Sequence, residues 1–347
     1  MRNDRVRYLQ ENGKTFYVSP KGTKYLEVGN KRHRGPLTTN PILELLDYPK
    51  PPTLHEIFNF ADKEAMLKWL AQEAANLTNR PITDTQAYVL KGNALLKELA
   101  KEWMSSRDIA VYQNPDYLFE TICCSLYVTG EFKKDGRLGK NSGIDNMMRT
   151  LHMLGYDKKA ARILDMGSGL GFTTLYAAYF CPHATVYYND TSPPSRLLFQ
   201  KLVARSGLTN IVILDDWREP PEELDVVMGF EFVEHISSED DPLVGDPMLP
   251  IRHVHPHIKL GGHFLYSTMW NAEQNNGETI GHFTSYRFGD TVVNLDVGKS
   301  DRRSRAPHKL FTDQMKKLGY KIRNGGGART EWDWKNHYPY CYTKVSA

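Results

Sequence analysis

Residues 161–180 read ARILDMGSGLGFTTLYAAYF and hold the strongest structural signal in the chain. A short apolar run ends at an acid, Asp165, and three glycines follow at alternate positions, Gly167, Gly169 and Gly171. An apolar helical pattern begins directly after the last glycine. This order predicts a strand, a tight loop and a helix, the arrangement that holds a nucleotide-like ligand at the end of a strand.

The sequence beyond residue 160 predicts an α/β fold around this loop. Short runs rich in β-branched and aromatic residues alternate there with helical patterns, which indicates βαβ units and a doubly wound, mostly parallel sheet. Ligands bind such sheets at the carboxyl ends of the strands, where the glycine loop is predicted to lie. The strand-like runs are RILDM, TVYYND, IVILDD, LDVVMGFEF and HVHPHIKLGGHFLYST, and the tail TEWDWKNHYPYCYTKV is predicted to form a closing antiparallel hairpin.

The glycine spacing argues against a dinucleotide as the ligand. A dinucleotide loop has the pattern G-x-G-x-x-G, and Phe172 occupies the position of its third glycine here. Asp165 lies two residues before the first glycine, where its negative charge would repel a pyrophosphate. The loop therefore suits a ligand that is cationic or neutral at this point.

The pattern D-M-G-S-G-L-G resembles the first motif of class I S-adenosylmethionine-dependent methyltransferases, and further motifs follow in the family's order. The resemblance implies a Rossmann-like seven-stranded sheet, mostly parallel with an antiparallel C-terminal hairpin, and S-adenosyl-L-methionine as cofactor. In such proteins a carboxylate at Asp190 would accept hydrogen bonds from the ribose, and Asp216 and Trp217 would contact the adenine. The cofactor-binding residues implied are Asp165, Gly167, Ser168, Gly169, Gly171, Asp190, Asp216, Trp217 and Glu231.

The segment EFVEH brings Glu231, Glu234 and His235 to one turn. It resembles a turn of ubiquinone-pathway O-methyltransferases and of small-RNA 2′-O-methyltransferases, which implies Mg²⁺ bound by these three residues and His282. A bound ion would lower the pKa of an acceptor hydroxyl. Other methyltransferases carry a similar turn without a metal, with the acid in the cofactor pocket and the histidine as a base. The candidate catalytic residues are His235, Glu234 and His282.

The chain divides into three regions by pattern. Residues 1–52 form a basic arm, residues 53–158 a helical region that would cover the site and select the substrate, and residues 159–347 the cofactor-binding domain. Thr53 and Glu56 form a capping-box pattern at the start of the helical region. The segment QNPDYLF precedes the glycine loop, so it would fit an amino-methyltransferase only if the motif order were permuted.

Composition places the chain among soluble globular proteins, with 40% hydrophobic and 24% charged residues. No apolar run approaches the roughly 18 residues of a membrane span. The four cysteines lack disulfide-like or zinc-like spacing, so we expect reduced thiols and a cytoplasmic protein.

The distribution of charge along the chain is compatible with more than one kind of binding partner. Residues 1–36 contain nine basic and three acidic residues, a net +6, so the rest of the +3 chain carries −3. The arm is either a solvated terminus or a contact for phosphates. Three functions are compatible with these features: a methyltransferase for the oxygen or nitrogen of a small molecule, which we favour, a methyltransferase for RNA or another nucleic acid, and a protein that binds the cofactor without catalysis.

Overall fold

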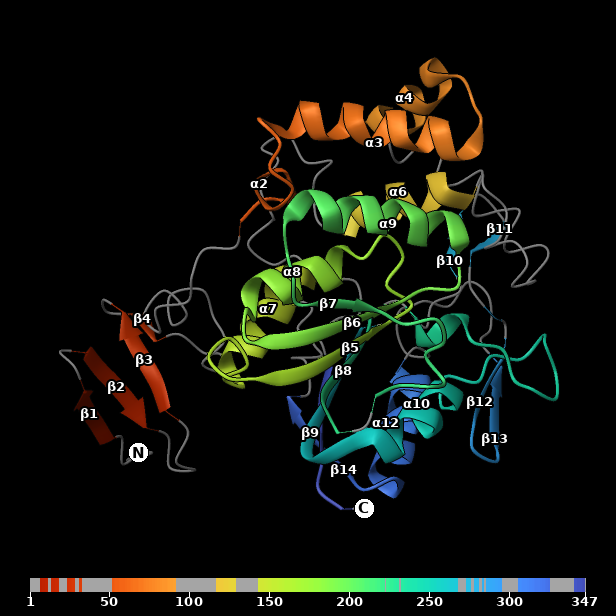
Figure 1. The fold of residues 1–347 in the computed structure, drawn as a ribbon. Helices are drawn as coiled ribbons and strands as arrows, with labels where there is room; N and C mark the ends of the chain where they lie inside the picture. Colours follow the sequence, from red (N-terminus) through yellow and green to blue (C-terminus); the bar gives the residue numbers. More distant parts are fainter. Residues whose placement is uncertain are drawn as a thin grey trace. The chain divides into compact units, whose positions relative to one another are not determined.

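The computed structural model describes two compact units, residues 1–50 and 51–347, each considered by itself (Figure 1). No helix in the described part of the chain is long and apolar enough to cross a membrane. The described residues are 7–11, 14–18, 24–28, 31–32, 52–91, 117–128, 143–221, 223–230, 232–267, 273–275, 278–280, 283, 285–294, 305–324 and 340–346.

The first unit is a four-stranded antiparallel sheet with neighbouring strands joined in chain order. Its strands are β1 (Arg7–Glu11), β2 (Lys14–Val18), β3 (Lys24–Val28) and β4 (Lys31–Arg32). The sequence pattern indicated only a basic arm, because strands of two to five residues with charged ends give little alternation to detect.

The second unit is built on a seven-stranded sheet with the order β14-β15-β9-β8-β5-β6-β7. Five strands are parallel, and β15 and β14 are antiparallel to β9 and to each other, so the predicted doubly wound sheet with a closing antiparallel hairpin is confirmed. The strands are β5 (Ala161–Met166), β6 (Ala184–Asn189), β7 (Ile211–Ile213), β8 (Leu224–Phe230), β9 (Ile258–Ser267), β14 (Tyr320–Asn324) and β15 (Tyr340–Lys344).

Two details of this sheet differ from the sequence prediction. The first hairpin strand, β14, precedes the tail in which both strands were expected. The run HVHPHIKLGGHFLYST, predicted to be a strand, begins with the end of α10 (Leu249–Val254) and the short helix η3 (His255–His257), and its glycine pair Gly261–Gly262 lies within β9, where the pairing with β8 shifts register. An added Cβ at Gly262 would come within 2.9 Å of the Lys259 carbonyl oxygen, so the chain folds tightly on itself at this irregularity.

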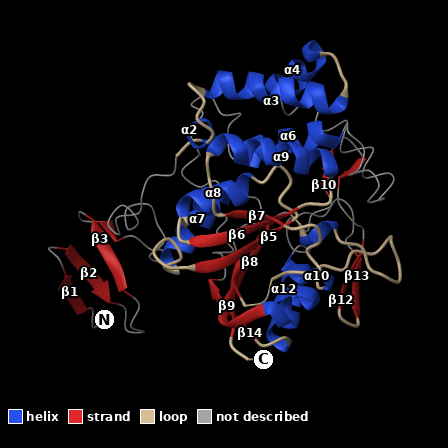
Figure 2. Ribbon diagram, in the orientation of Figure 1, coloured by secondary structure: helices blue, strands red, loops and turns tan. Residues whose placement is uncertain are grey.

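Helices cover both faces of the sheet (Figure 2). On one side lie α7 (Gly143–Met153), α8 (Phe172–Phe180) and α9 (Pro193–Ser206), and on the other α10 (Leu249–Val254) and α12 (Arg305–Lys317). Phe264, Tyr266 and Phe311 belong to one buried cluster between the sheet and α12. Two short hairpins join β9 to α12: β10 (Glu273–Asn275) with β11 (Glu278–Ile280), and β12 (Ser285–Phe288) with β13 (Thr291–Asn294).

The helical region before the sheet packs on α9. Its helices are α2 (Leu54–Ile57), α3 (Lys63–Thr78), α4 (Ile82–Lys91) and α6 (Tyr117–Val128). The predicted capping box at Thr53 is present, and the backbone amide of Thr53 donates to Glu56 Oε2 at 2.6 Å. Lys201 of α9 pairs with Glu73 of α3, and the Arg205 guanidinium lies 3.7 Å from the centre of the Phe60 ring. These contacts fix the helical region over one face of the sheet.

A buried lysine anchors the last strand. Lys344 of β15 is only 6% exposed, and its Nζ donates to the carbonyl oxygens of His255 at 2.8 Å and Ile258 at 2.9 Å. His255 is the first residue of the short 3₁₀ helix η3 (His255–His257), and Ile258 follows its last residue. The ammonium therefore joins the hairpin to the start of β9.

We expect Lys344→Met to lower the free energy of unfolding by about 1.5–3 kcal/mol, because two buried carbonyls lose a charged donor. Lys321→Met is the matched control, since Lys321 is exposed on the neighbouring strand β14, and it should change the free energy by less than about 0.5 kcal/mol. Urea unfolding measures both. An equal effect of the two substitutions would contradict the anchoring role.

Candidate functional site

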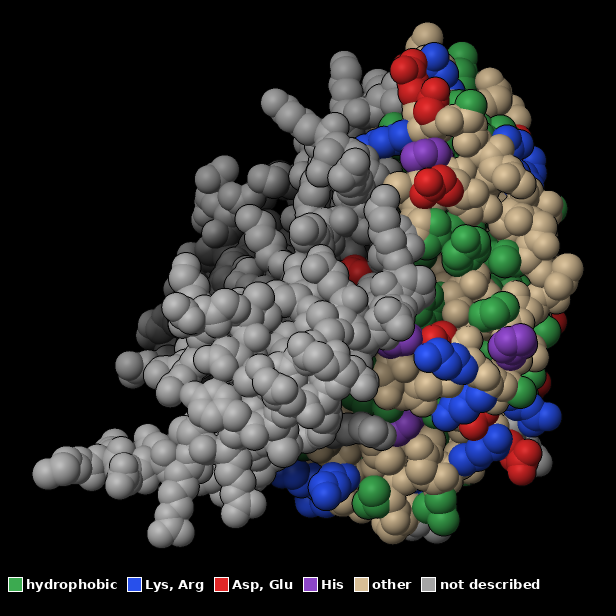
Figure 3. Space-filling model, turned by 90° about the vertical axis from the view of Figure 1, so that its left-hand side faces the viewer, with side chains coloured by type: hydrophobic (Ala, Val, Ile, Leu, Met, Phe, Trp, Pro, Cys, Tyr) green, Lys and Arg blue, Asp and Glu red, His purple; other side chains and the backbone are tan. Residues whose placement is uncertain are grey.

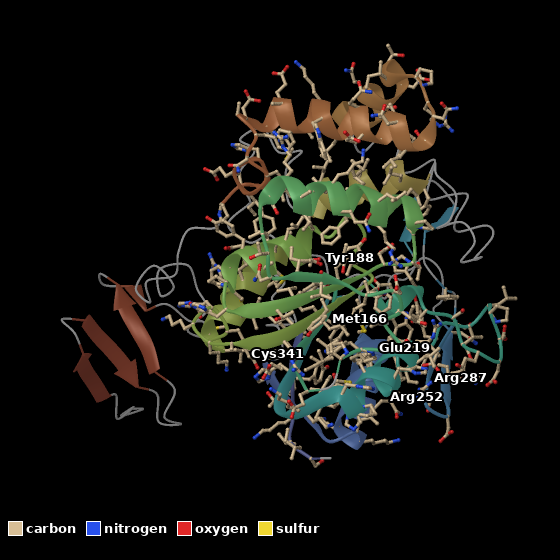
Figure 4. The ribbon with its side chains drawn as sticks, in the orientation of Figure 1. Met166, Tyr188, Glu219, Arg252, Arg287 and Cys341 are labelled. Atoms are coloured by element: carbon tan, nitrogen blue, oxygen red, sulfur yellow. The ribbon has the colours of Figure 1, made fainter. Side chains whose placement is uncertain are left out.

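The glycine loop connects β5 to α8 at the carboxyl edge of the sheet. Gly167, Gly169 and Gly171 have φ angles of +61°, +56° and +69°, a left-handed backbone that favours glycine. Figure 4 labels Met166 and Tyr188, which lie on the adjacent strands β5 and β6 beside this loop. The predicted strand, loop and helix are therefore all present.

Two of the glycines make room for aromatic rings. A Cβ added at Gly167 would lie 2.1 Å from the Phe232 ring, and one at Gly171 would lie 2.2 Å from the Phe199 ring. Phe199 itself stacks on Tyr188 with ring centres 3.7 Å apart. Side chains at these two positions would displace packed rings, so both glycines are required for packing whatever the loop binds.

Gly169 has a different neighbour, the helix α6. A Cβ there would lie 3.1 Å from Thr121 Cγ2 and 3.7 Å from Ser125 Oγ. These distances place α6, which belongs to the helical region before the sheet, directly against the middle of the loop. Sequence reasoning missed Thr121 and Ser125, because nothing local links α6 to a loop more than forty residues later.

Asp165 is buried beneath the loop, with 1% of its surface exposed. Its Oδ2 accepts hydrogen bonds from the hydroxyls of Thr173 at 2.6 Å and Thr174 at 2.7 Å. Burial raises the pKa of this carboxyl to about 6, and the hydrogen bonds from the two threonines and Ser168 oppose that rise. Asp165 thus holds the first turn of α8 to the end of β5, and direct contact with a ligand stays a prediction.

Asp190 ties the loop to the next strand. Its Oδ2 accepts from the amide of Gly169 at 2.8 Å, and its Oδ1 accepts from the amide of Ser192 at 2.8 Å. The Tyr188 hydroxyl donates to the Gly169 carbonyl at 2.8 Å, so both backbone groups of Gly169 are fixed from β6. Burial raises the pKa of Asp190 to about 6, and the two amide bonds and Arg196 oppose that rise.

The predicted adenine residues follow β7. Asp216 is half-buried and accepts from the amide of Arg218 at 2.9 Å. Trp217 is 3% exposed, and its ring meets the Phe232 ring edge-on with centres 6.2 Å apart. Asn189 Nδ2 donates to the Leu214 carbonyl at 3.2 Å, while Asn189 Oδ1 is buried without a hydrogen-bond partner among the described residues.

The EFVEH turn forms a short 3₁₀ helix, η2 (Val233–His235), after β8. Glu234 is fully buried and His235 is half-buried, whereas Glu231 and His282 lie outside the described residues. Phe232 of this turn covers Gly167, so the turn and the glycine loop are in contact. Within the described ranges no three His, Cys, Asp or Glu side chains are grouped to hold a metal ion.

A second polar group, which sequence reasoning missed, lies at the carboxyl end of β9. Tyr266 pairs with Gly229 of β8 and Tyr340 of β15, and its hydroxyl lies 2.9 Å from Nδ1 of His308 at the start of α12. Burial lowers the pKa of His308 to about 4, so its imidazole is neutral at pH 7. The sequence DRRSRAPHKLF, residues 301–311, did not predict the contact of His308 with Tyr266, because that contact depends on how α12 packs on the sheet.

We expect Gly171→Ala to destabilise the protein much more than Gly207→Ala. Both glycines have a φ near +70°, but an added Cβ at Gly207 meets nothing within 4 Å. Gly207→Ala should therefore cost only the strain of a left-handed backbone, about 1–2 kcal/mol. Gly171→Ala adds the collision with Phe199 and should cost at least about 1 kcal/mol more. Equal losses in urea unfolding would show that the ring contact at Gly171 is unimportant.

Comparisons with known proteins gave no family model and no curated protein that matches this chain. Solved structures match at low identity. A putative S-adenosyl-L-methionine-dependent methyltransferase from Methanococcus maripaludis is 13% identical over 60% of this chain and 88% of that chain, with a TM-score of 0.37. A SAM-dependent methyltransferase from Aquifex aeolicus is 15% identical over 59% and 89%, with a TM-score of 0.36.

The YcgJ protein from Bacillus subtilis is 18% identical over 38% of this chain, with a TM-score of 0.30, and the chain spans about half of it, 52%. Similarities at this level of identity carry no conclusion about the activity of this chain. The strand order is a property of the sheet itself and does not depend on these comparisons. In it β5 is flanked by β8 and β6, and the antiparallel strands β15 and β14 follow β9. The glycine loop lies at the carboxyl end of β5, and the chain has a doubly wound, Rossmann-like α/β fold.

Proposed function

We propose that the protein transfers a methyl group from S-adenosylmethionine to an oxygen or nitrogen of a small-molecule acceptor. The observation that carries the proposal is the glycine loop bound to Asp190 at the adjacent carboxyl ends of β5 and β6. Fold alone does not assign activity. The proposal therefore rests on what these residues can hold.

The residues at the loop fit the parts of the cofactor. The loop is built of glycine backbone in the left-handed region, which would let the methionyl part approach the main chain closely. Asp190 has acceptor capacity beyond its two amide bonds, since each carboxylate oxygen has two lone pairs, and ribose hydroxyls can use it. Asp216 and Trp217 would supply a carboxylate and an aromatic ring for the adenine. Glu231 stays a prediction from the sequence.

Asp165 takes a different role in this proposal from the one the sequence indicated. Its carboxylate is occupied by the threonine hydroxyls that begin α8, so it shapes the loop rather than meeting the ligand first. A negative charge below the loop still favours a cationic ligand over a pyrophosphate at this point.

The reaction requires mainly alignment. The cofactor supplies a methyl group activated by a sulfonium, and the chain's residues must hold the acceptor in line with it and exclude water. An acceptor that loses a proton needs a base, and the candidates are His235 of η2, after β8, and His308 at the start of α12, whose Nδ1 lies 2.9 Å from the Tyr266 hydroxyl of β9. Glu234 of η2, also predicted to be catalytic, is fully buried and would act through its charge.

A bound Mg²⁺ ion was a further prediction from the sequence. Ligation by Glu231, Glu234, His235 and His282 is implied only by the resemblance of the EFVEH turn, and no cluster among the described side chains supports it. Methyl transfer to nitrogen, or to a hydroxyl served by a histidine, proceeds without an ion. The proposal therefore does not include a metal.

A nucleic-acid methyltransferase is the second candidate, and the charge of the N-terminal unit favours it. On the face in Figure 3, acidic, basic and histidine side chains of the described residues lie interspersed. The strong excess of positive charge in this sequence is instead in residues 1–36. A protein that binds the cofactor without turnover is the third reading, and only an activity assay separates it from the first two.

Calorimetric titration with S-adenosylhomocysteine tests the cofactor. We expect micromolar binding that EDTA and Mg²⁺ leave unchanged, and a loss of at least about tenfold in Asp190→Ala, which lacks the ribose acceptor. Asp215→Ala is the matched control, because Asp215 is exposed next to Asp216 and its carboxylate pairs with Arg196. No binding by the unaltered chain would overturn the proposal, and loss of binding on adding EDTA would reinstate the metal.

Cofactor affinity should fall as the pH is lowered through about 6. The pKa of Asp190 is raised to about 6 in the free protein, and ribose hydroxyls bind its ionised form. Binding then lowers that pKa, so below it each pH unit costs up to about tenfold in affinity. Asp190→Asn cannot titrate at this position and should bind weakly with a flatter pH profile. A constant affinity between about pH 7.5 and 5.5 in the unaltered chain would contradict the contact.

A further inference from the structure

Aromatic rings from three elements meet at the carboxyl end of β9. They belong to Tyr266 of β9, His308 of α12 and Tyr340 of β15, and Cys341, labelled in Figure 4, follows Tyr340 on its strand. The ring centre of Tyr340 lies 4.0 Å from that of His308 and 5.1 Å from that of Tyr266. Tyr266 is fully buried, whereas His308 and Tyr340 are half-buried, so these two rings are the part of the cluster that a ligand can reach.

The His308 imidazole is held by one of its two nitrogens. Its Nδ1 lies 2.9 Å from the Tyr266 hydroxyl, which fixes the orientation of the ring. Its Nε2 makes no hydrogen bond within the described part of the chain. Polar atoms in protein interiors are normally paired, and an apolar side chain would fill the same space among these rings. A histidine at this point therefore indicates a polar group of a ligand as the partner of Nε2.

The charge around the cluster selects against anions. Burial lowers the pKa of His308 to about 4, so this imidazole carries no positive charge at pH 7. Burial also raises the pKa of the Tyr266 hydroxyl well above its usual value, and the neighbouring tyrosines and Glu234 raise it further. The negative charge of Glu234 thus reaches the cluster, while Tyr266, His308 and Tyr340 carry no charge to offset it. A phosphate group would be repelled here.

The cluster adjoins the predicted cofactor loop. Tyr266 pairs with Gly229 of β8, and a Cβ added at Gly229 would lie 3.6 Å from the Phe232 ring. The same ring covers Gly167 of the loop. Phe232 therefore contacts both the loop and the strand end next to Tyr266, so an acceptor held by the cluster would lie beside a cofactor held by the loop.

We propose that His308 and Tyr340 bind the methyl acceptor, and that this acceptor is an uncharged aromatic ring with a hydroxyl or amino group. The ring of the acceptor stacks beside the His308–Tyr340 pair, and its polar group bonds Nε2 of His308. Tyr266 is a positioning residue, because it acts through the imidazole. The inference rests on the proposed methyl transfer and adds the class of acceptor. It disfavours a nucleic acid, whose phosphates carry the charge that the cluster repels.

Fluorine NMR with two probes, 4-fluorophenol and 4-fluoroaniline, tests the proposal on the full chain with and without S-adenosylhomocysteine. We expect at least one probe to bind with a Kd of about a millimolar or lower, and the probe that binds more tightly distinguishes a hydroxyl from an amino group. Cyclohexanol, which lacks the aromatic ring, and phenyl phosphate, which carries the negative charge, should each compete at least about tenfold more weakly than phenol or aniline.

Substitutions separate the parts of the site. His308→Leu should weaken probe binding at least about fivefold, because Nε2 is lost. Tyr340→Leu should weaken it about threefold to tenfold, and Tyr340→Phe should leave it within about twofold. His183→Leu is the matched control, because His183 is exposed between α8 and β6, and it should have no effect. Tyr266→Phe keeps the ring but removes the hydroxyl, so it should weaken binding and change the tautomer of His308 in nitrogen-15 NMR, which Tyr340→Phe should not do.

Three outcomes would overturn the proposal: neither probe binds, phenyl phosphate competes as well as phenol and aniline, or His308→Leu binds the probe as tightly as His183→Leu. Circular dichroism shows whether His308→Leu is folded, and if it is not, the comparison of Tyr340→Leu with Tyr340→Phe decides. Calorimetric titration with S-adenosylhomocysteine on the same samples tests the cofactor site separately. Cofactor binding without probe binding would overturn this inference alone, whereas probe binding without cofactor binding would overturn the proposed function and leave only an aromatic binding site.

Discussion

The structure of the site depends on two carboxylates at neighbouring strand ends, Asp165, which is buried, and Asp190, which is partly buried. Asp165 ends β5 and holds the first turn of α8 through two threonine hydroxyls, and Asp190 follows β6 and holds the amide of Gly169. Ionised carboxylates are costly to bury, and the raised pKa of each records that cost. Hydrogen bonds to the loop and to α8 offset it. The same bonds fix the glycines in a conformation that side chains rarely adopt.

The loop is enclosed from two further directions. Phe232, from the turn after β8, covers Gly167, and Thr121 of α6 lies close to Gly169. α6 belongs to the helical region, which the Lys201–Glu73 pair and the Arg205–Phe60 contact join to α9. A ligand at the loop would thus meet the sheet, the EFVEH turn and the helical region together. This arrangement explains how residues before the sheet could influence which acceptor enters.

Sequence could predict the parts of the fold that depend on local pattern. The order of acid, glycines and apolar helix predicted β5, the loop and α8, and the alternation of runs predicted the parallel sheet and its closing hairpin. It did not predict the partners of the loop, because the contacts of Gly167 with Phe232 and of Gly169 with Thr121 join distant segments. Nor did it predict the N-terminal strands, whose short runs resemble a basic arm. The assignments of Glu231 and His282 concern residues outside the described ranges and stay predictions.

A crystal structure of the protein with S-adenosylhomocysteine would test the central claim most directly. We expect ribose hydroxyls within hydrogen-bond distance of the Asp190 carboxylate and the methionyl part along Gly167 and Gly169, with Asp165 still bonded to Thr173 and Thr174. Ligand bound away from this loop, with Asp190 bonded only to Gly169 and Ser192, would contradict it.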